Sequence, residues 1–93
     1  MGRREGGLAA IGGRLALGDG DEVDAVIEAP DGRIVGIEVK AAATVDGADF
    51  RHLKHLADRV PDQFQHGFVL YTGRRVLQFG DRMTAAPIAA LWA

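Results

Sequence analysis

Apolar and polar residues alternate along two neighbouring stretches of the chain, residues 22–29 and 33–40. In each stretch the apolar side chains share one face, which predicts two β-strands. The intervening Pro-Asp-Gly at 30–32 suits a three-residue hairpin loop, because Pro favours the first inner position of a type I turn and Gly the left-handed position that follows. This loop fixes the pairing of the two strands and predicts Ala25 opposite Ile37, with every apolar partner on the same face.

A helix is predicted after this hairpin. Asp46 is a favourable N-cap, Asp49 is an acidic residue in the first turn, and Pro61 ends the helix. The apolar residues between them recur at helical spacing, which predicts a buried stripe. That stripe consists of Phe50, Leu53, Leu56, Ala57 and Val60.

The remaining segments give weaker signals. Residues 67–71 and 75–79 are expected to be strands, and a short last segment ends at 88–92. Residues 1–18 contain six glycines, and each glycine costs a helix about 1 kcal/mol relative to alanine. We therefore expect a poor helix there, followed by a short strand at Arg14–Leu17.

These patterns predict an α/β fold with a mixed, mainly antiparallel sheet and one well-defined helix. Residues 1–18 form a glycine-rich N-terminal segment, and residues 19–93 form the domain itself. A chain of 93 residues is long enough for one domain with a thin core. Such a chain, with exposed strand edges, is expected to form a homodimer.

Composition excludes several classes of protein. The chain has no cysteine, and therefore neither a disulfide framework nor a thiolate zinc site. It has no apolar run of membrane-spanning length and no signal-peptide pattern, so we expect a cytoplasmic protein without a membrane partner. The net charge of −2 argues mildly against a protein that coats nucleic acid. It is compatible with a nuclease, whose acidic pocket offsets basic residues elsewhere.

The polar face of the predicted hairpin carries the candidate chemistry. The same pairing places Asp24 opposite Glu38 and Glu22 opposite Lys40. Two carboxylates at directly paired positions repel, and a divalent cation such as Mg²⁺ or Mn²⁺ would compensate. Lys40 shares this face, where it could orient or deprotonate an attacking water, or offset charge that develops on phosphorus. Gly36 leaves room there for a phosphate backbone.

Spacing alone favours a plainer interpretation, in which this face is solvated and Glu22 and Lys40 form an ordinary surface pair. The outer face of the helix also permits two interpretations. His52 and His55 are three residues apart and could reach one metal ion, but no third ligand is evident. A solvated basic face that contacts phosphates is more typical. Its candidate nucleic-acid-binding residues are Arg51, Lys54 and Arg59.

Two sequence motifs change this balance. Glu-Val-Asp at 22–24, followed by Gly-Ile-Glu-Val-Lys-Ala at 36–41, resembles the PD-(D/E)XK nuclease superfamily, whose core is α-β-β-β-α-β. More narrowly, residues 19–92 are similar to the C-terminal domain of unknown function attached to certain AAA-type ATPases. That similarity covers Asp-Glu-Val-Asp at 21–24, Gly-Ile-Glu-Val-Lys at 36–40, Asp49-Phe50 with Leu53, residues 69–73 and the closing segment from Pro87 to Trp92.

The resemblance implies a restriction-endonuclease-like core and a metal-dependent DNA endonuclease that hydrolyses phosphodiester bonds with Mg²⁺ or Mn²⁺. It implies that Asp24, Glu38 and the carbonyl of Val39 are metal ligands, and that Lys40 is the catalytic lysine beside the two carboxylates. A second function stays open. The chain could instead be a catalytically silent interaction or nucleic-acid-binding module, derived from the C-terminus of an AAA-type ATPase.

Overall fold

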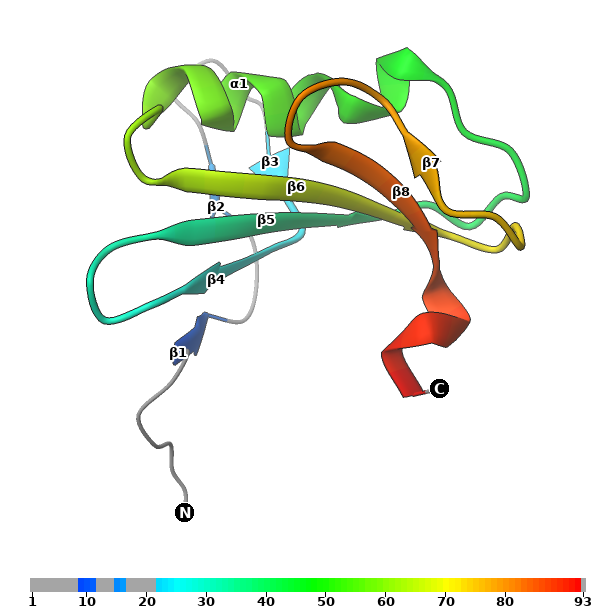
Figure 1. The fold of residues 1–93 in the computed structure, drawn as a ribbon, viewed down its shortest axis with the longest axis horizontal. Helices are drawn as coiled ribbons and strands as arrows, with labels where there is room; N and C mark the ends of the chain where they lie inside the picture. Colours follow the sequence, from blue (N-terminus) through cyan, green and yellow to red (C-terminus); the bar gives the residue numbers. More distant parts are fainter. Residues whose placement is uncertain (1–8, 12–14, 17–21, 93) are drawn as a thin grey trace.

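A single helix covers one face of a mixed β-sheet in the computed structural model (Figure 1). The structure describes residues 9–11, 15–16 and 22–92, with side chains described from Val23 to Ala90. In spatial order, the sheet contains β1 (Ala9–Ile11), β4 (Ala25–Glu28), β5 (Ile34–Val39), β6 (Phe64–Tyr71), β8 (Met83–Pro87) and β7 (Leu77–Gln78). The pairs β1–β4, β4–β5 and β7–β8 are antiparallel, whereas β5–β6 and β6–β8 are parallel. The predicted α/β class is therefore confirmed.

The β4–β5 hairpin has the predicted pairing. Ala25 lies opposite Ile37, and the loop is closed by a hydrogen bond of 2.8 Å from Ala29 N–H to the Arg33 carbonyl. Gly32 has a φ of 93°, in the left-handed region that favours glycine. The three-residue loop and its left-handed glycine, from which the register was predicted, are therefore both present in the structure.

The first predicted strand is interrupted at Asp24, where the backbone bends. Before the bend, β3 (Glu22–Val23) pairs with β2 (Leu15–Ala16) in a separate two-stranded ladder. Glu22 therefore lies opposite Ala16, and the predicted pairing of Glu22 with Lys40 is wrong. The bend ends the ladder with β5 before it reaches these positions, and the Lys40 N–H instead donates to the Leu70 carbonyl at 2.8 Å.

The predicted helix is present, with a tight first turn. A 3-10 turn, η1 (Gly47–Phe50), leads directly into α1 (Arg51–Arg59). Asp46 is the N-cap, as predicted, and it forms a capping box with Asp49. The helix then connects β5 to its parallel neighbour β6, as a crossover must.

Two strands differ from the prediction. Residues 9–11 were expected within a poor helix, but they form β1 and pair with β4. Glycines disfavour a helix there, whereas an edge of β4 offers backbone partners to an extended segment. The expected strand at Arg14–Leu17 is represented by β2, and the ends of that range lie outside the described residues. Strand β8 was not predicted, although it lies between β6 and β7.

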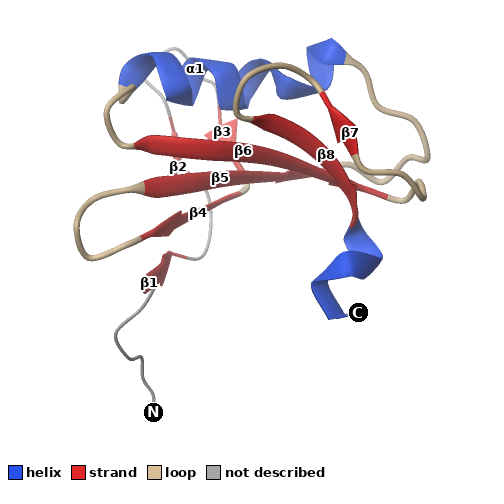
Figure 2. Cartoon of the chain, in the orientation of Figure 1, coloured by secondary structure: helices blue, strands red, loops and turns tan. Residues whose placement is uncertain are grey.

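Helix α1 lies over one face of the sheet (Figure 2), and the hydrophobic core lies between the two. Its buried members are Val23, Val26, Ile34, Phe50, Leu53, Leu56, Ala57, Phe64, Val69, Tyr71, Met83 and Ala85. Gly36 also lies beneath the helix, where a Cβ atom would come within 2.8 Å of Leu53 Cδ2. The expectation that Gly36 admits a phosphate backbone is therefore wrong, because the helix occupies that space.

Side chains along β5 point alternately to the two faces of the sheet, and this alternation places Glu38. Ile34 and Gly36 face the helix, so Glu38 points to the same side of the sheet. The polar end of β5 thus lies beneath the start of the helix. None of the helices in the described part of the chain is long and apolar enough to cross a membrane.

Candidate functional site

Asp24 and Glu38 lie together, as the hairpin pairing predicted, but each is held by the backbone of the other strand. The Asp24 N–H donates to Glu38 Oε1 at 3.3 Å. In return, the Val39 N–H donates to Asp24 Oδ2 at 2.9 Å. The bend at Asp24 makes this exchange possible, because it releases the Asp24 N–H from the strand ladder. Two carboxylates are therefore fixed at the end of the β4–β5 hairpin.

Lys40 follows the end of β5 and reaches the start of the helix. Its Nζ lies 2.7 Å from Asp49 Oδ2, and both side chains are partly buried. The same Asp49 oxygen accepts the Asp46 N–H at 2.8 Å. Asp49 therefore joins the helix cap to the candidate catalytic lysine.

His52, one turn into the helix, contacts Glu38. Its Nδ1 lies 2.9 Å from Glu38 Oε2, and the exposed fraction of the Glu38 side chain is only 16%. We name Asp24, Glu38, Lys40, Asp49 and His52 the strand-end cluster.

The sequence placed His52 on a solvated basic face, and it gave Asp49 a place only in the first turn of the helix and in the family resemblance. Two features of the sequence could have indicated that both residues lie beside Glu38 and Lys40. Asp49 and His52 are three residues apart and so share one side of a helix, and Gly36 permits that helix to approach β5 closely.

Two carboxyl groups of the strand-end cluster have pKa values shifted in opposite directions. Burial has the largest effect on the pKa of Glu38, and it raises that pKa. The hydrogen bond with His52 lowers the pKa, whereas the charge of Asp24 raises it. The net shift of the Glu38 pKa is upward. Partial burial also acts to raise the pKa of Asp49. There, however, the bonds from Lys40 and from the Asp46 backbone outweigh burial, and the pKa of Asp49 is lowered.

A pocket of about 220 Å³ opens beside these groups. Its lining consists of Glu38, Val39, Lys40, Ala48, Asp49, Arg51, His52 and Val69. Glu38, Lys40, Asp49 and His52 therefore share one solvent-accessible space with Arg51 on its wall. Asp24 lies behind Glu38, bonded to Val39, and does not line the pocket.

The described side chains do not form a complete metal cage. Among them, no group of three or more His, Asp or Glu residues is arranged to hold an ion. Among the described residues, His52 and His55 are not members of such a group, and His52 contacts Glu38 rather than lying on a fully solvated face. The possible metal ligands at the strand ends are the carboxylates of Asp24 and Glu38 and the backbone carbonyl of Val39.

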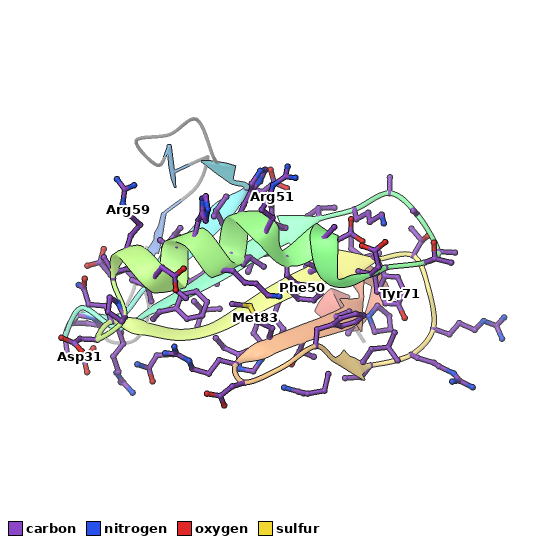
Figure 3. All side chains as sticks on the ribbon, turned by 90° about the horizontal axis from the view of Figure 1, so that it is seen from above. Asp31, Phe50, Arg51, Arg59, Tyr71 and Met83 are labelled. Carbon is purple, nitrogen blue, oxygen red and sulfur yellow. The ribbon has the colours of Figure 1, made fainter. Side chains whose placement is uncertain are left out.

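The three predicted nucleic-acid-binding residues all lie on α1, and two of them line different pockets. Arg51 lines the pocket of the strand-end cluster, whereas Lys54 lines another groove together with Asp58 and Asp81. Figure 3 shows Arg51 and Arg59 on the same flank of the helix, toward its two ends. Only Arg51 is therefore placed beside the candidate site.

Comparison with known proteins gives a family but no described activity. No curated protein and no solved structure matches the chain significantly. A family model described as Domain of unknown function (DUF4143) matches residues 16–91, which includes every member of the strand-end cluster. This domain is often found at the C-termini of AAA-type ATPases. The chain belongs to the DUF4143 family.

Proposed function

We propose that the strand-end cluster is the active site of a metal-dependent DNA endonuclease of the PD-(D/E)XK type. The observation that carries this proposal is the contact between Asp24 and Glu38 at the strand ends, with Lys40 lining the same pocket as Glu38. Two fixed carboxylates can hold a metal ion that activates water, and a cationic side chain beside them can stabilise charge that develops on the phosphate. The substrate is DNA.

The donor set supports a divalent cation, Mg²⁺ or Mn²⁺. Mg²⁺ is commonly bound by one or two carboxylates together with water and substrate phosphate. Asp24 and Glu38 would supply those carboxylates and Val39 its carbonyl. Each Glu38 oxygen accepts one hydrogen bond, and a carboxylate oxygen has two lone pairs, so capacity for an ion remains. Burial, and to a lesser extent the charge of Asp24, raise the pKa of Glu38, and a bound cation would stabilise its charged form.

A cation bound there would lower the pKa of its bound water and neutralise charge on the phosphate. The protein's own residues supply the rest. Lys40, ion-paired with Asp49, is a cationic donor that would stabilise charge on the phosphoryl oxygens. Arg51, on the pocket wall, would bind a flanking phosphate. Lys54 and Arg59 are exposed and would add non-specific affinity.

The order of elements around the site also supports this assignment. The acidic residue precedes β4, the Glu-x-Lys motif ends β5, and α1 and β6 follow. This β-β-α-β succession corresponds to the last four elements of the α-β-β-β-α-β core of PD-(D/E)XK nucleases. Asp24 directly precedes β4, and the Glu-x-Lys motif lies at the end of the neighbouring strand β5.

Nicking of supercoiled plasmid DNA in the presence of Mn²⁺ tests this function. We expect the wild-type protein to nick the plasmid, and Glu38→Ala and Lys40→Ala to lose about 10²–10³-fold in rate. Asp58→Asn is the control, since it removes an exposed carboxylate of α1 that does not line the pocket. Lys40→Ala cutting as fast as the wild type would refute the catalytic assignment.

One observation favours a second candidate, the catalytically silent module. Glu38 and Lys40 already have protein partners, His52 and Asp49. Such a network can be purely structural. Metal binding separates the two candidates, because a cation that binds only the folded state raises stability by about 2.7 kcal/mol at a hundredfold excess over Kd. A melting temperature that millimolar Mn²⁺ leaves unchanged, with DNA binding retained, would establish the silent module.

We further propose that the chain acts as a homodimer, because two active sites would cut both strands of a duplex. Val76, which is next to the edge strand β7, is 69% exposed. An exposed apolar residue at a sheet edge favours association. Light scattering should give about twice the monomer mass, and a mass of 9.9 kDa would exclude the dimer.

A further inference from the structure

Each charged residue at the end of β5 is held by a partner on the helix. Glu38 is bonded to His52, and Lys40 to Asp49. We propose that His52 and Asp49 are positioning residues, which orient the metal ligand and the cationic donor without touching the DNA themselves. This inference rests on the proposed nuclease function, and it assigns roles to two residues that the Glu-x-Lys motif does not contain.

His52 completes the restraint on Glu38. One oxygen of that carboxylate accepts the Asp24 N–H at 3.3 Å, and the other faces His52 Nδ1 at 2.9 Å. With both oxygens held, the carboxylate has one orientation, and the directions of its remaining lone pairs are fixed. Without His52 a single, longer bond would remain, and the terminal torsion of Glu38 would be free to rotate. Residues that orient metal ligands in this way commonly change metal affinity 10–100-fold.

Asp49 provides the corresponding restraint on Lys40. A lysine side chain is a flexible four-carbon stem, so its charge has no fixed place unless a partner holds it. Asp49 Oδ2 lies 2.7 Å from Lys40 Nζ and also accepts the Asp46 N–H at 2.8 Å. Because the capping box fixes Asp49, the position of the lysine charge is set by the start of the helix.

The two restraints act on different steps and therefore predict different defects. His52 acts on a metal ligand, so its loss should weaken metal binding and cleavage together. Asp49 acts on the cationic donor, so its loss should reduce kcat while leaving metal affinity and KM for DNA nearly unchanged. A merely structural role would lower the melting temperature without separating these quantities.

The first experiment compares His52→Ala, His52→Asn and the control His55→Asn. Free Mn²⁺, measured by electron paramagnetic resonance, gives the Kd of each protein. We expect His52→Ala to bind Mn²⁺ about 10–100-fold more weakly. His52→Asn should recover most of the affinity, because its amide N–H can take the place of Nδ1–H. Equal Mn²⁺ affinity in His52→Ala and wild type would overturn the role of His52.

The second experiment compares Asp49→Asn with Asp58→Asn, which removes the same charge from an exposed position. The amide oxygen that Asp49→Asn introduces can still accept the Asp46 N–H, so the cap is retained. We expect kcat to fall on the order of 10²-fold, as for a catalytic group misplaced by ~1 Å, with Mn²⁺ affinity within about twofold of wild type. Without metal, the slowly exchanging Lys40 ammonium signal in nitrogen-15 NMR spectra should broaden in Asp49→Asn alone.

These outcomes also distinguish the inference from the function on which it rests. A wild-type protein that neither binds Mn²⁺ nor cuts DNA overturns both. A wild-type protein that cuts DNA, with Asp49→Asn and His52→Ala indistinguishable from it in kcat and Mn²⁺ affinity, overturns only the positioning roles. Loss of activity that merely tracks a lowered melting temperature, without recovery in His52→Asn, also overturns them.

Discussion

The helix meets β5 in two very different ways along its length. Toward the middle of the helix, Leu53 and Leu56 pack so closely over Gly36 that a single added carbon would collide with both side chains. At the start of the helix, the contact consists of two polar bonds beside a pocket of about 220 Å³. Close packing fixes the distance between the two elements, whereas the polar bonds fix the directions of charged groups. The close-packed contact and the candidate site therefore lie on neighbouring turns of one helix.

The largest effect on stability is expected from Leu53→Ala. Leu53 is fully buried, and truncation of a buried leucine costs about 2–5 kcal/mol. In a domain of this size, each kcal/mol lowers the melting temperature by roughly 4–8 °C. Thermal denaturation followed by circular dichroism measures the shift. Thr44→Ala is the control, since Thr44 is exposed and its truncation should change stability by no more than about 0.5 kcal/mol.

A smaller loss is expected from Gly36→Ala. The added Cβ would lie 2.8 Å from Leu53 Cδ2 and 3.2 Å from Leu56 Cδ2, and overpacking of this kind costs about 1–3 kcal/mol. Gly47→Ala is the matched control, because a Cβ there has no atom within 4 Å. Urea denaturation should separate the two variants. If Gly36→Ala were as stable as wild type, the close contact between helix and strand would be contradicted.

The smallest expected effects on stability come from Glu38 and Asp49 at the start of the helix. Their contributions to stability should change in opposite directions as pH rises. Because the pKa of Glu38 is raised, the folded state binds more protons than the unfolded state just above the ordinary pKa, and stability falls as pH rises there. The pKa of Asp49 is lowered, so its contribution is present above its ordinary pKa and is lost as pH falls through the lowered value.

Melting curves of the metal-free protein between about pH 3 and pH 7 test this difference. Glu38→Gln should gain stability relative to wild type as pH rises, since it no longer acquires a buried charge. Asp49→Asn should lose stability relative to wild type over the same rise. Parallel pH profiles for the two variants would contradict the opposite shifts.

Local chemistry explains which parts of the fold were predictable. The hairpin register followed from a three-residue loop, and the helix followed from Asp46 and Pro61, because each signal lies within a few residues of the structure that it determines. Strand β8 was missed because Met-Thr-Ala-Ala-Pro at 83–87 has little strand propensity of its own. It is a strand because β6 and β7 pair with it on either side.

In the candidate site, too, residues with local sequence signals were predictable and residues placed by distant contacts were not. Asp24, Glu38 and Lys40 were predictable because a hairpin register brings two of them together and a two-residue spacing adds the third. Their partners were not, because assigning Asp49 and His52 requires knowledge of which face of β5 the helix covers. The alternating apolar residues Val35 and Ile37 favoured one face, yet the helix lies over Gly36 on the other.

The hydrogen bonds of the strand-end cluster also bear on how the protein folds. They join residues that are only 9 to 15 positions apart in the sequence. Closing a loop of that length costs little conformational entropy, and contacts of short sequence separation favour fast folding. The segment from Asp24 to His52 contains the whole cluster. Its residues can therefore assemble before β8 completes the sheet, and the cluster can be inherited, or transferred to another scaffold, as one continuous piece of chain.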